Sequence, residues 1–416
     1  MAQKTYWILY LFFLNTTIEL VNGEFRKLFE KGIRYERLSP INFTEISREY
    51  GYKSEEHTVI TEDGYVLTLF RIPRGKNCHF TAQRTPVLIM HGLLLSSDSW
   101  IDSGPEAGLA YLISDDCYDL WAGNVRGNYY SRNHIRMNPD EDPEFWKFSL
   151  NEVGVYDLPA IIDYILDYTR SVKLNYIGYS QSGGSFVIMC SEKLGYCDKV
   201  RVAILLHPVA KMTNAKSQAF RAITEVYQIL EPNLQNALEL EALPRGGYVQ
   251  KIVHDICQND LIADKICRSI LTVLDSYNPG SVSVSTIRTL TGHFPGGTSV
   301  RVMAWFNQVL NKKEFQNFDY GPLMNMKIYG SKQPSIYNCN ATTAPIVIIH
   351  GKNDNIVSKK DVEWLKNQLP NVLEVVYVKN PLWNHFDVPY SQHTREMIYP
   401  KISEDLFKYS GNGVEL

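Results

Sequence analysis

The feature that most restricts the fold is a series of short apolar runs that alternate with segments of helical periodicity. Runs of this length and composition fit strands that are covered on both faces of a sheet. Helical periods separate several of them, as in residues 155–168 and 181–194. The alternation predicts an α/β fold, a mostly parallel sheet with helices on both faces. The six runs are 86–90, 118–122, 174–177, 202–206, 345–349 and 373–378.

Two intervals depart from this alternation. Residues 56–71 hold two alternating runs around Asp63-Gly64, a pair typical of a β-hairpin, so the sheet is expected to begin with antiparallel strands.

Between the fourth and fifth runs lie 138 residues, 207–344. A helical crossover normally needs only about 10–15 residues. Because residues 211–325 are rich in amphipathic helix-forming sequence, we expect a helical cap inserted there. An independent second domain is the alternative.

The first 23 residues have the pattern of a secretory signal peptide: Lys4, an apolar run over 6–14, and small residues before a cleavage point at Glu24. Nine apolar residues are too few for a membrane span, which needs roughly 20. No transmembrane segment is expected, and retention of residues 1–23 as an anchor is the alternative. The expected division is therefore a signal peptide (1–23), a sheet domain in two parts (24–210 and 326–416) and the cap (211–325).

Export predicts an oxidising environment, in which the seven cysteines can form disulfides. An odd number leaves at least one thiol free. Cys257 and Cys267 are the pair we expect to be bonded. Cys190 and Cys197 are expected on a single helix, where about 10 Å would separate them, and are therefore interpreted as unpaired apolar side chains.

Other sequence signals are weaker. Asn42 and Asn340 begin N-x-Ser/Thr sequons and are candidate glycosylation sites. The net charge of −3 provides no basic field for phosphate backbones, so nucleic acid is not an expected partner. No Cys/His cluster has zinc-site spacing, so a metal centre is not expected.

Residues 174–185, LNYIGYSQSGGS, are the strongest chemical signal. A buried-strand pattern runs into Ser180 and then into two glycines that open a helix. This is the context of a nucleophile elbow, in which a strained serine between strand and helix attacks a carbonyl. Residues two before and two after the serine must be small. Gly178 fits this requirement, whereas Ser182 fits it only in part. The alternative interpretation is a Ser/Gly-rich helix start without chemistry.

Acyl transfer also needs donors for the oxyanion that develops on the substrate. His91-Gly92-Leu93 directly follows the 86–90 run, and we expect the backbone N–H groups of Leu93 and Gln181 to form the oxyanion hole. His91 is interpreted as a residue that fixes this loop.

A serine nucleophile needs a histidine base and a carboxylate, which follow it in the order acid, then histidine. Asp354 follows the 345–349 run, and His385 follows the last run. Asp387 and Asp361 are alternatives for the acid. Asp387 is better explained as a surface or loop-capping group. Among the other histidines, we expect His57, His79, His254, His293 and His393 on the surface, and His134 and His350 in loop-fixing roles.

With these residues in place, the chain resembles the acid lipase family of α/β-hydrolases, which includes gastric and lysosomal acid lipases. The resemblance covers nearly the whole chain after the predicted signal peptide and includes MHGLLLSSDSW, DLWAGNVRGNYYSRNH, the elbow, GGTSVRVMAWFNQ, HGKNDNIV and WNHFDV. It implies Ser180, Asp354 and His385 as a catalytic triad, Leu93 and Gln181 as oxyanion donors, and a mobile cap. It implies no metal and no cofactor.

Three residues depart from the family pattern. Tyr179 replaces a histidine, Ser182 replaces a glycine, and His207 begins a turn that usually reads Ala-Pro-Val-Ala. We interpret His207 as a satisfied buried or loop histidine. The resemblance implies a secreted or lysosomal serine lipase that hydrolyses fatty-acyl esters of neutral lipids, triacylglycerol or sterol esters, at a lipid–water interface. The alternative is a non-catalytic lipid carrier that has kept the fold.

Overall fold

The computed structural model describes residues 42–409, except 77, 79–84 and 235–239. Its centre is an eight-stranded sheet of order β1-β2-β4-β3-β5-β6-β9-β10. β2 pairs antiparallel with β1 and β4, and the other pairs are parallel. The predicted mostly parallel sheet is confirmed. The strands are β1 Glu55–Ile60, β2 Val66–Ile72, β3 Val87–Met90, β4 Leu120–Gly123, β5 Leu174–Tyr179, β6 Val200–Leu206, β9 Ile346–His350 and β10 Val372–Tyr377.

The apolar runs explain why the inner strands lie where they do. Every residue of β3, β4, β5 and β9 is buried, because helices cover both faces of the sheet. The antiparallel β1 and β2 alternate more in burial, as expected for a hairpin near the sheet edge. Gly64 has φ +95° in the loop that joins them, a conformation that favours glycine.

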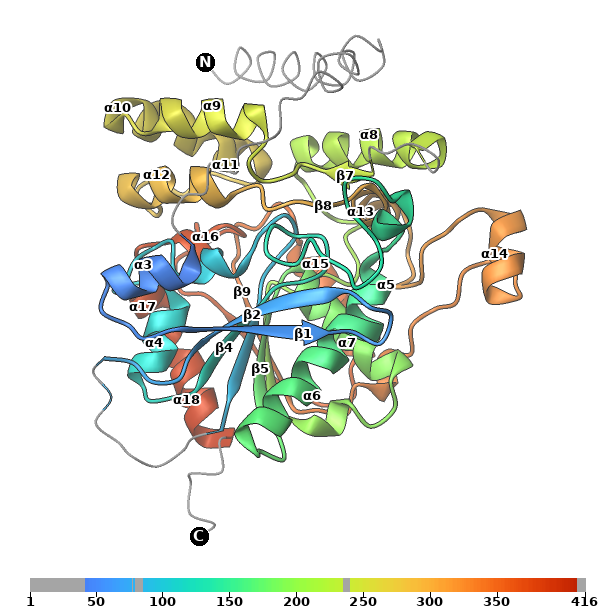
Figure 1. Cartoon of the computed structure of the whole chain (residues 1–416), viewed down its shortest axis with the longest axis horizontal. Coiled ribbons are helices and arrows are strands. Elements are labelled where there is room, and N and C mark those ends of the chain that lie inside the picture. Colours follow the sequence, from blue (N-terminus) through green and yellow to red (C-terminus); the bar gives the residue numbers. More distant parts are fainter. Residues whose placement is uncertain (1–41, 77, 79–84, 235–239, 410–416) are drawn as a thin grey trace. The chain divides into compact units, whose positions relative to one another are not determined.

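Helices flank the sheet in two groups (Figure 1). α6 packs on α7, and α4 packs on α18, on the opposite face. Outside the cap, the helices and helical turns are α3 Phe43–Glu49, η1 Ser97–Trp100, α4 Leu109–Asp115, η2 Pro143–Trp146, α5 Leu150–Glu152, η3 Val153–Asp157, α6 Leu158–Thr169, α7 Gln181–Glu192, η4 Cys197–Lys199, α14 Pro322–Tyr329, η6 Cys339–Ala341, α15 Lys359–Gln368, α16 Asp387–Tyr390, α17 Thr394–Met397 and α18 Tyr399–Tyr409.

The long interval between β6 and β9 is mainly helical. Helices α8 to α12 lie over one end of the sheet in Figure 1. The cap boundaries at 211 and 325 stay a prediction. The part of this interval that we call the cap below contains α8 Gln218–Leu234, β7 Glu241–Ala242, α9 Tyr248–Cys257, α10 Asp260–Ile262, η5 Ala263–Cys267, α11 Arg268–Leu274, α12 Val284–His293, β8 Thr298–Ser299 and α13 Val300–Asn311.

The predicted signal peptide, residues 1–23, lies outside the described residues. Among the helices that the structure describes, none has both the length and the apolar character needed to span a membrane. Asn340 is exposed and Asn42 is half-buried at the start of α3, so glycosylation at these sequons stays a prediction.

The cysteine predictions are confirmed in one case and wrong in another. Cys257 and Cys267 form the expected disulfide. Cys190 and Cys197 are also bonded, with their Cα atoms 5.1 Å apart. The single-helix expectation fails because α7 ends at Glu192 and the chain reverses at Gly195, where φ is +83°. All seven cysteines are described: Cys78 bonds Cys117, and Cys339 is buried and free.

Candidate active site

Ser180 occupies the sharp turn between β5 and α7. Its φ of +55° and ψ of −115° form a strained conformation for a residue with a side chain. A Cβ atom on Gly178 would lie 2.9 Å from the carbonyl oxygen of Ser182, so only glycine fits there. The turn predicted from the sequence is therefore present, and it holds Ser180 at the end of the sheet.

At Gly184 the helix after this turn lies against the segment that follows β6. A Cβ atom there would lie 2.1 Å from the carbonyl oxygen of Val209, which makes Gly184 the most demanding position. Ser182, whose side chain was expected to crowd the turn, instead donates from Oγ to the carbonyl oxygen of His91 at 2.5 Å. Ser182 thus ties the start of α7 to the loop after β3.

Ser180, His385 and Asp354 form one continuous line of hydrogen bonds. The Oγ of Ser180 lies 2.9 Å from Nε2 of His385, and Nδ1 of His385 lies 2.7 Å from Oδ2 of Asp354. All three side chains are buried. The loops after β5, β9 and β10 bring these residues together from positions up to 205 residues apart.

The alternative acids have other partners. Asp387 is buried and accepts a hydrogen bond from the backbone N–H of Asn384, which fits the predicted loop-capping role but not a surface position. Asp361 accepts hydrogen bonds from the backbone and side chain of Asn214. These contacts favour Asp354 as the acid.

Four donors surround the carboxylate of Asp354. Oδ1 accepts from the backbone N–H groups of Ile356 and Val357 at 2.8 and 2.7 Å. Oδ2 lies near ring nitrogens of both His385 and His207. Burial raises the pKa of Asp354, but the charge of His385 and the hydrogen bonds from both histidines outweigh it. The pKa is therefore well below its usual range, and the group is a carboxylate.

His207, at the end of β6, is a fully buried and satisfied histidine, as the sequence suggested. Its Nδ1 lies 2.6 Å from Oδ2 of Asp354, and its Nε2 accepts from the backbone N–H of Gly351 at 3.0 Å. His207, His350 and Asp354 together bring three metal-ligating atoms within 4.8 Å of one another. Within this cluster Asp354 and His207 already hydrogen-bond each other, and coordination of an ion would break that bond.

Two further residues that the motifs did not predict fix the histidine loop. Asp275, the residue after α11 in the cap, accepts from the backbone N–H of His385 and from that of Asn355, both at 2.7 Å. Tyr179 donates from its hydroxyl to the carbonyl oxygen of His385 at 2.9 Å. Asp275 could not be identified from local sequence because its partners lie 80 and 110 residues away.

The loop after β3 lies against the turn that carries Ser180. A Cβ atom on Gly92 would lie 3.2 Å from Cβ of Ser180, so a glycine permits this approach. Leu93 follows directly, and Gln181 is the first residue of α7, where a backbone N–H has no acceptor within the helix. The oxyanion role of Leu93 and Gln181 stays a prediction. From the cap, the N–H of Gly296 donates to the carbonyl oxygen of Leu94 at 2.6 Å.

His91 fixes this loop, as predicted. Its Nδ1 donates to the carbonyl oxygen of Gly92 at 2.8 Å. Its Nε2 accepts from Val125 N–H at 3.3 Å and lies 3.0 Å from Nδ2 of Asn128. Burial lowers the pKa of His91 to about 4, so the ring is neutral over most of the pH range.

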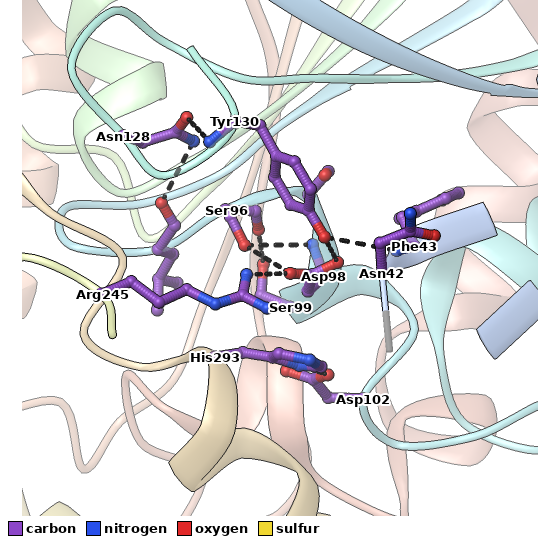
Figure 2. A network of polar contacts seen from close by, with 12 residues as sticks. Asn42, Phe43, Ser96, Asp98, Ser99, Asp102, Asn128, Tyr130, Arg245 and His293 are labelled. Atoms are coloured by element: carbon purple, nitrogen blue, oxygen red, sulfur yellow. Dashed lines mark hydrogen bonds and ion pairs between the residues drawn. The ribbon is translucent and has the colours of Figure 1, made fainter. Parts of the chain in front are cut away.

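A buried network joins the cap to the sheet domain beside this loop (Figure 2). Arg245 of the cap bonds Asp98 at 2.6 Å, and His293 at the end of α12 bonds Asp102 at 2.6 Å. Tyr130 donates to the second oxygen of Asp98 at 2.8 Å. The expected surface position of His293 is therefore wrong: the residue is 3% exposed because it pairs with a distant carboxylate. His79 lies outside the described residues.

The chain matches two models of known protein families. Residues 43–104 match the model of a partial alpha/beta-hydrolase lipase region, and residues 85–389 match that of the alpha/beta hydrolase fold. Among solved structures, an esterase from Thermogutta terrifontis covers 86% of this chain and 99% of its own, at 15% identity and a TM-score of 0.47.

Curated relatives are more similar in sequence. Lipase 3 of Drosophila melanogaster is 34% identical over 361 residues, which cover 86% of this chain and 91% of the relative. Human gastric triacylglycerol lipase is 32% identical over 373 residues, covering 88% and 92% of the two chains. The family model and these relatives extend over most of the chain. The protein therefore belongs to the acid lipase family of the α/β-hydrolases, a family of carboxylic ester hydrolases.

Proposed function

We propose that the protein is a lipase that hydrolyses fatty-acyl esters of neutral lipids, with Ser180 as nucleophile, His385 as base and Asp354 as acid. The observation that carries this proposal is the line of hydrogen bonds from Ser180 through His385 to Asp354, at 2.9 and 2.7 Å. A serine hydroxyl is a weak nucleophile, and this arrangement supplies the base that removes its proton.

In the proposed reaction, His385 takes the proton of Ser180 as the oxygen attacks the ester carbonyl. Asp354 holds the ring so that Nε2 faces Ser180, and it stabilises the imidazolium that forms. The N–H groups of Leu93 and Gln181 bind the oxyanion. His385 then gives its proton to the departing alcohol. Water releases the fatty acid in a second cycle of the same groups, and no metal or cofactor enters any step.

The neutral-lipid substrate is supported by the relatives and by the cap. Relatives of this chain include gastric triacylglycerol lipases. Ser180 is only 3% exposed, so a lipid ester reaches it only when the covering structure moves. Cap segments α8, α9, α10 and η5 expose large apolar side chains, which suit contact with a lipid surface. These are Val226, Ile229, Ile252, Ile256, Leu261 and Ile266.

We further propose that the protein acts outside the cytosol, after secretion or in lysosomes. Three disulfides support an oxidising environment during folding.

The alternative of a non-catalytic carrier rested on Tyr179 and Ser182. Both side chains form hydrogen bonds that tie together the proposed catalytic loops, so neither substitution argues against catalysis.

The test compares hydrolysis of emulsified triacylglycerol and of a soluble p-nitrophenyl acyl ester by the wild type and by Ser180→Ala. Ser171→Ala, in the loop before β5, is the matched control. We expect Ser180→Ala to lose turnover of both substrates while Ser171→Ala keeps it. Turnover by Ser180→Ala at the wild-type rate would refute the nucleophile. Turnover of the soluble ester alone by the wild type would refute the lipid substrate.

A further inference from the structure

We propose that His207 is a positioning residue that holds the carboxylate of Asp354 in line with His385 and, by sharing Oδ2, sets the acid limb of the pH–rate profile. The inference rests on the proposed triad. It goes beyond that triad because it adds a second imidazole to the acid.

The hydrogen-bond partners determine which nitrogen of His207 carries the proton. Nε2 faces the backbone N–H of Gly351 at 3.0 Å, and a backbone N–H can only donate. Nε2 is therefore an unprotonated acceptor. Nδ1 must carry the proton and donate it to Oδ2 of Asp354 at 2.6 Å. The neutral Nδ1–H tautomer is the one form of the ring that satisfies both contacts.

Charging His207 would break this arrangement. A proton on Nε2 would point at the N–H of Gly351, in a place where the ring is fully buried. Burial lowers the pKa of His207, against the raising effect of Asp354. His207 therefore stays neutral, and it acts on the triad as a fixed donor rather than as a second base.

A fixed donor on Oδ2 has two effects on His385. Two backbone N–H groups hold Oδ1, and His207 holds Oδ2, so the carboxylate cannot rotate freely. His207 also draws electron density from the oxygen that faces Nδ1 of His385, at 2.7 Å. A carboxylate that shares its charge stabilises an imidazolium less. We therefore expect the acid limb of the activity profile to lie at a lower pH with His207 present than without it.

Other titratable groups lie around His207, Asp354 and His385 on the neighbouring elements. They are Tyr179 at the end of β5, His350 at the end of β9, Lys359 in α15, Asp275 after α11 and Asp387 in α16. Because these groups stay the same when only residue 207 changes, a comparison of variants at that position cancels their contributions.

Two substitutions separate the two hydrogen bonds of His207. His207→Asn keeps an N–H donor at the position of Nδ1 and loses the contact with Gly351. His207→Gln places an acceptor at the position of Nε2 and loses the donor to Asp354. The assay is the pH dependence of kcat/KM for a soluble ester, together with kcat and KM at the optimum.

We expect His207→Asn to keep the acid limb of the wild type. We expect His207→Gln to move that limb up by roughly one pH unit, with kcat several-fold lower and KM little changed. Identical acid limbs in all three proteins, or equal shifts in both variants, would overturn the proposal. Ser180→Ala separates this failure from that of the proposed function, which fails only if Ser180→Ala retains turnover.

A measurement on the unmodified enzyme covers the case in which a variant does not fold. Nitrogen-15 NMR of histidine-labelled wild type should show two buried rings with Nδ1 protonated and Nε2 unprotonated, those of His91 and His207, and the ring of His207 should keep this form throughout the acid limb. The signal is assigned to His207 by through-space contact with the backbone N–H of Gly351, which donates to its Nε2, so that no variant is needed. This form of the ring, assigned in this way, supports the proposal. A ring at this position that titrates together with activity, or that carries its proton on Nε2, would overturn it.

Discussion

Asp275 offers the sharpest test of how the cap supports the catalytic loops. Its carboxylate accepts two backbone N–H groups at 2.7 Å, one from His385 and one from Asn355 next to the acid. Asp275→Asn keeps the shape of the side chain but leaves it a single acceptor oxygen. One of the two N–H groups must then face the new amide NH₂ group, and a buried donor loses its partner.

The cost of this change can be worked from the contacts. A buried donor without an acceptor costs about 1–3 kcal/mol. One effect works in the opposite direction: burial and the charge of Asp354 raise the pKa of Asp275, so removal of its charge relieves repulsion. We therefore expect the free energy of unfolding to fall by about 1–2 kcal/mol. Because the loop of His385 loses an anchor, we also expect kcat to fall by about 10²-fold, the cost of a displacement near 1 Å.

The assay is urea unfolding together with ester hydrolysis at saturating substrate. Asp255→Asn is the matched control, since Asp255 is an exposed carboxylate on α9 of the same cap. We expect this control to change neither quantity. Equal stability and equal kcat in Asp275→Asn and the wild type would refute the reasoning that the cap fixes the catalytic loops.

Two further predictions concern the cap and the acid loop. Burial alone would lower the pKa of His293, but the charges of Asp102 and Asp98 raise it above its ordinary value. The ion pair of His293 and Asp102 contributes its full stability at pH values below the pKa of His293 in the unfolded chain, about 6.5. This stability is lost as pH rises through the pKa of His293 in the folded protein. As pH rises through that range, the free energy of unfolding of His293→Gln should therefore fall less than that of the wild type. The same fall in both proteins, measured by urea unfolding at several pH values, would contradict this. A Cβ atom on Gly351 would lie 2.2 Å from the carbonyl oxygen of Trp383, so Gly351→Ala should destabilise the protein by about 3 kcal/mol; wild-type stability in the same assay would show that this backbone contact is adaptable.

Much of the fold could be predicted because its signals are local. Each inner strand is a short apolar run, and the sharp turn at Ser180 needs small residues at fixed spacing. The order of serine, acid and histidine then left few choices for Asp354 and His385. The same local reasoning failed for Cys190 and Cys197, since it extended α7 past a chain reversal at Gly195.

What sequence reasoning missed depends on contacts between distant segments. His293 was expected on the surface because its neighbours in sequence are polar, yet its partner Asp102 lies 191 residues away. His207 was recognised as a buried histidine, but its bond to Asp354 spans 147 residues and carries no local signal. Asp275 belongs to the cap, and only the folded chain shows that it bonds the loops of both Asp354 and His385.

The most direct test of the central claim is the site of covalent modification by a fluorophosphonate probe, mapped by mass spectrometry of peptides. The probe reacts with a serine that a neighbouring base has activated. We predict that the label resides on Ser180 in the wild type and that labelling is lost in His385→Ala. A label on another residue, or labelling of His385→Ala at the wild-type rate, would contradict the account.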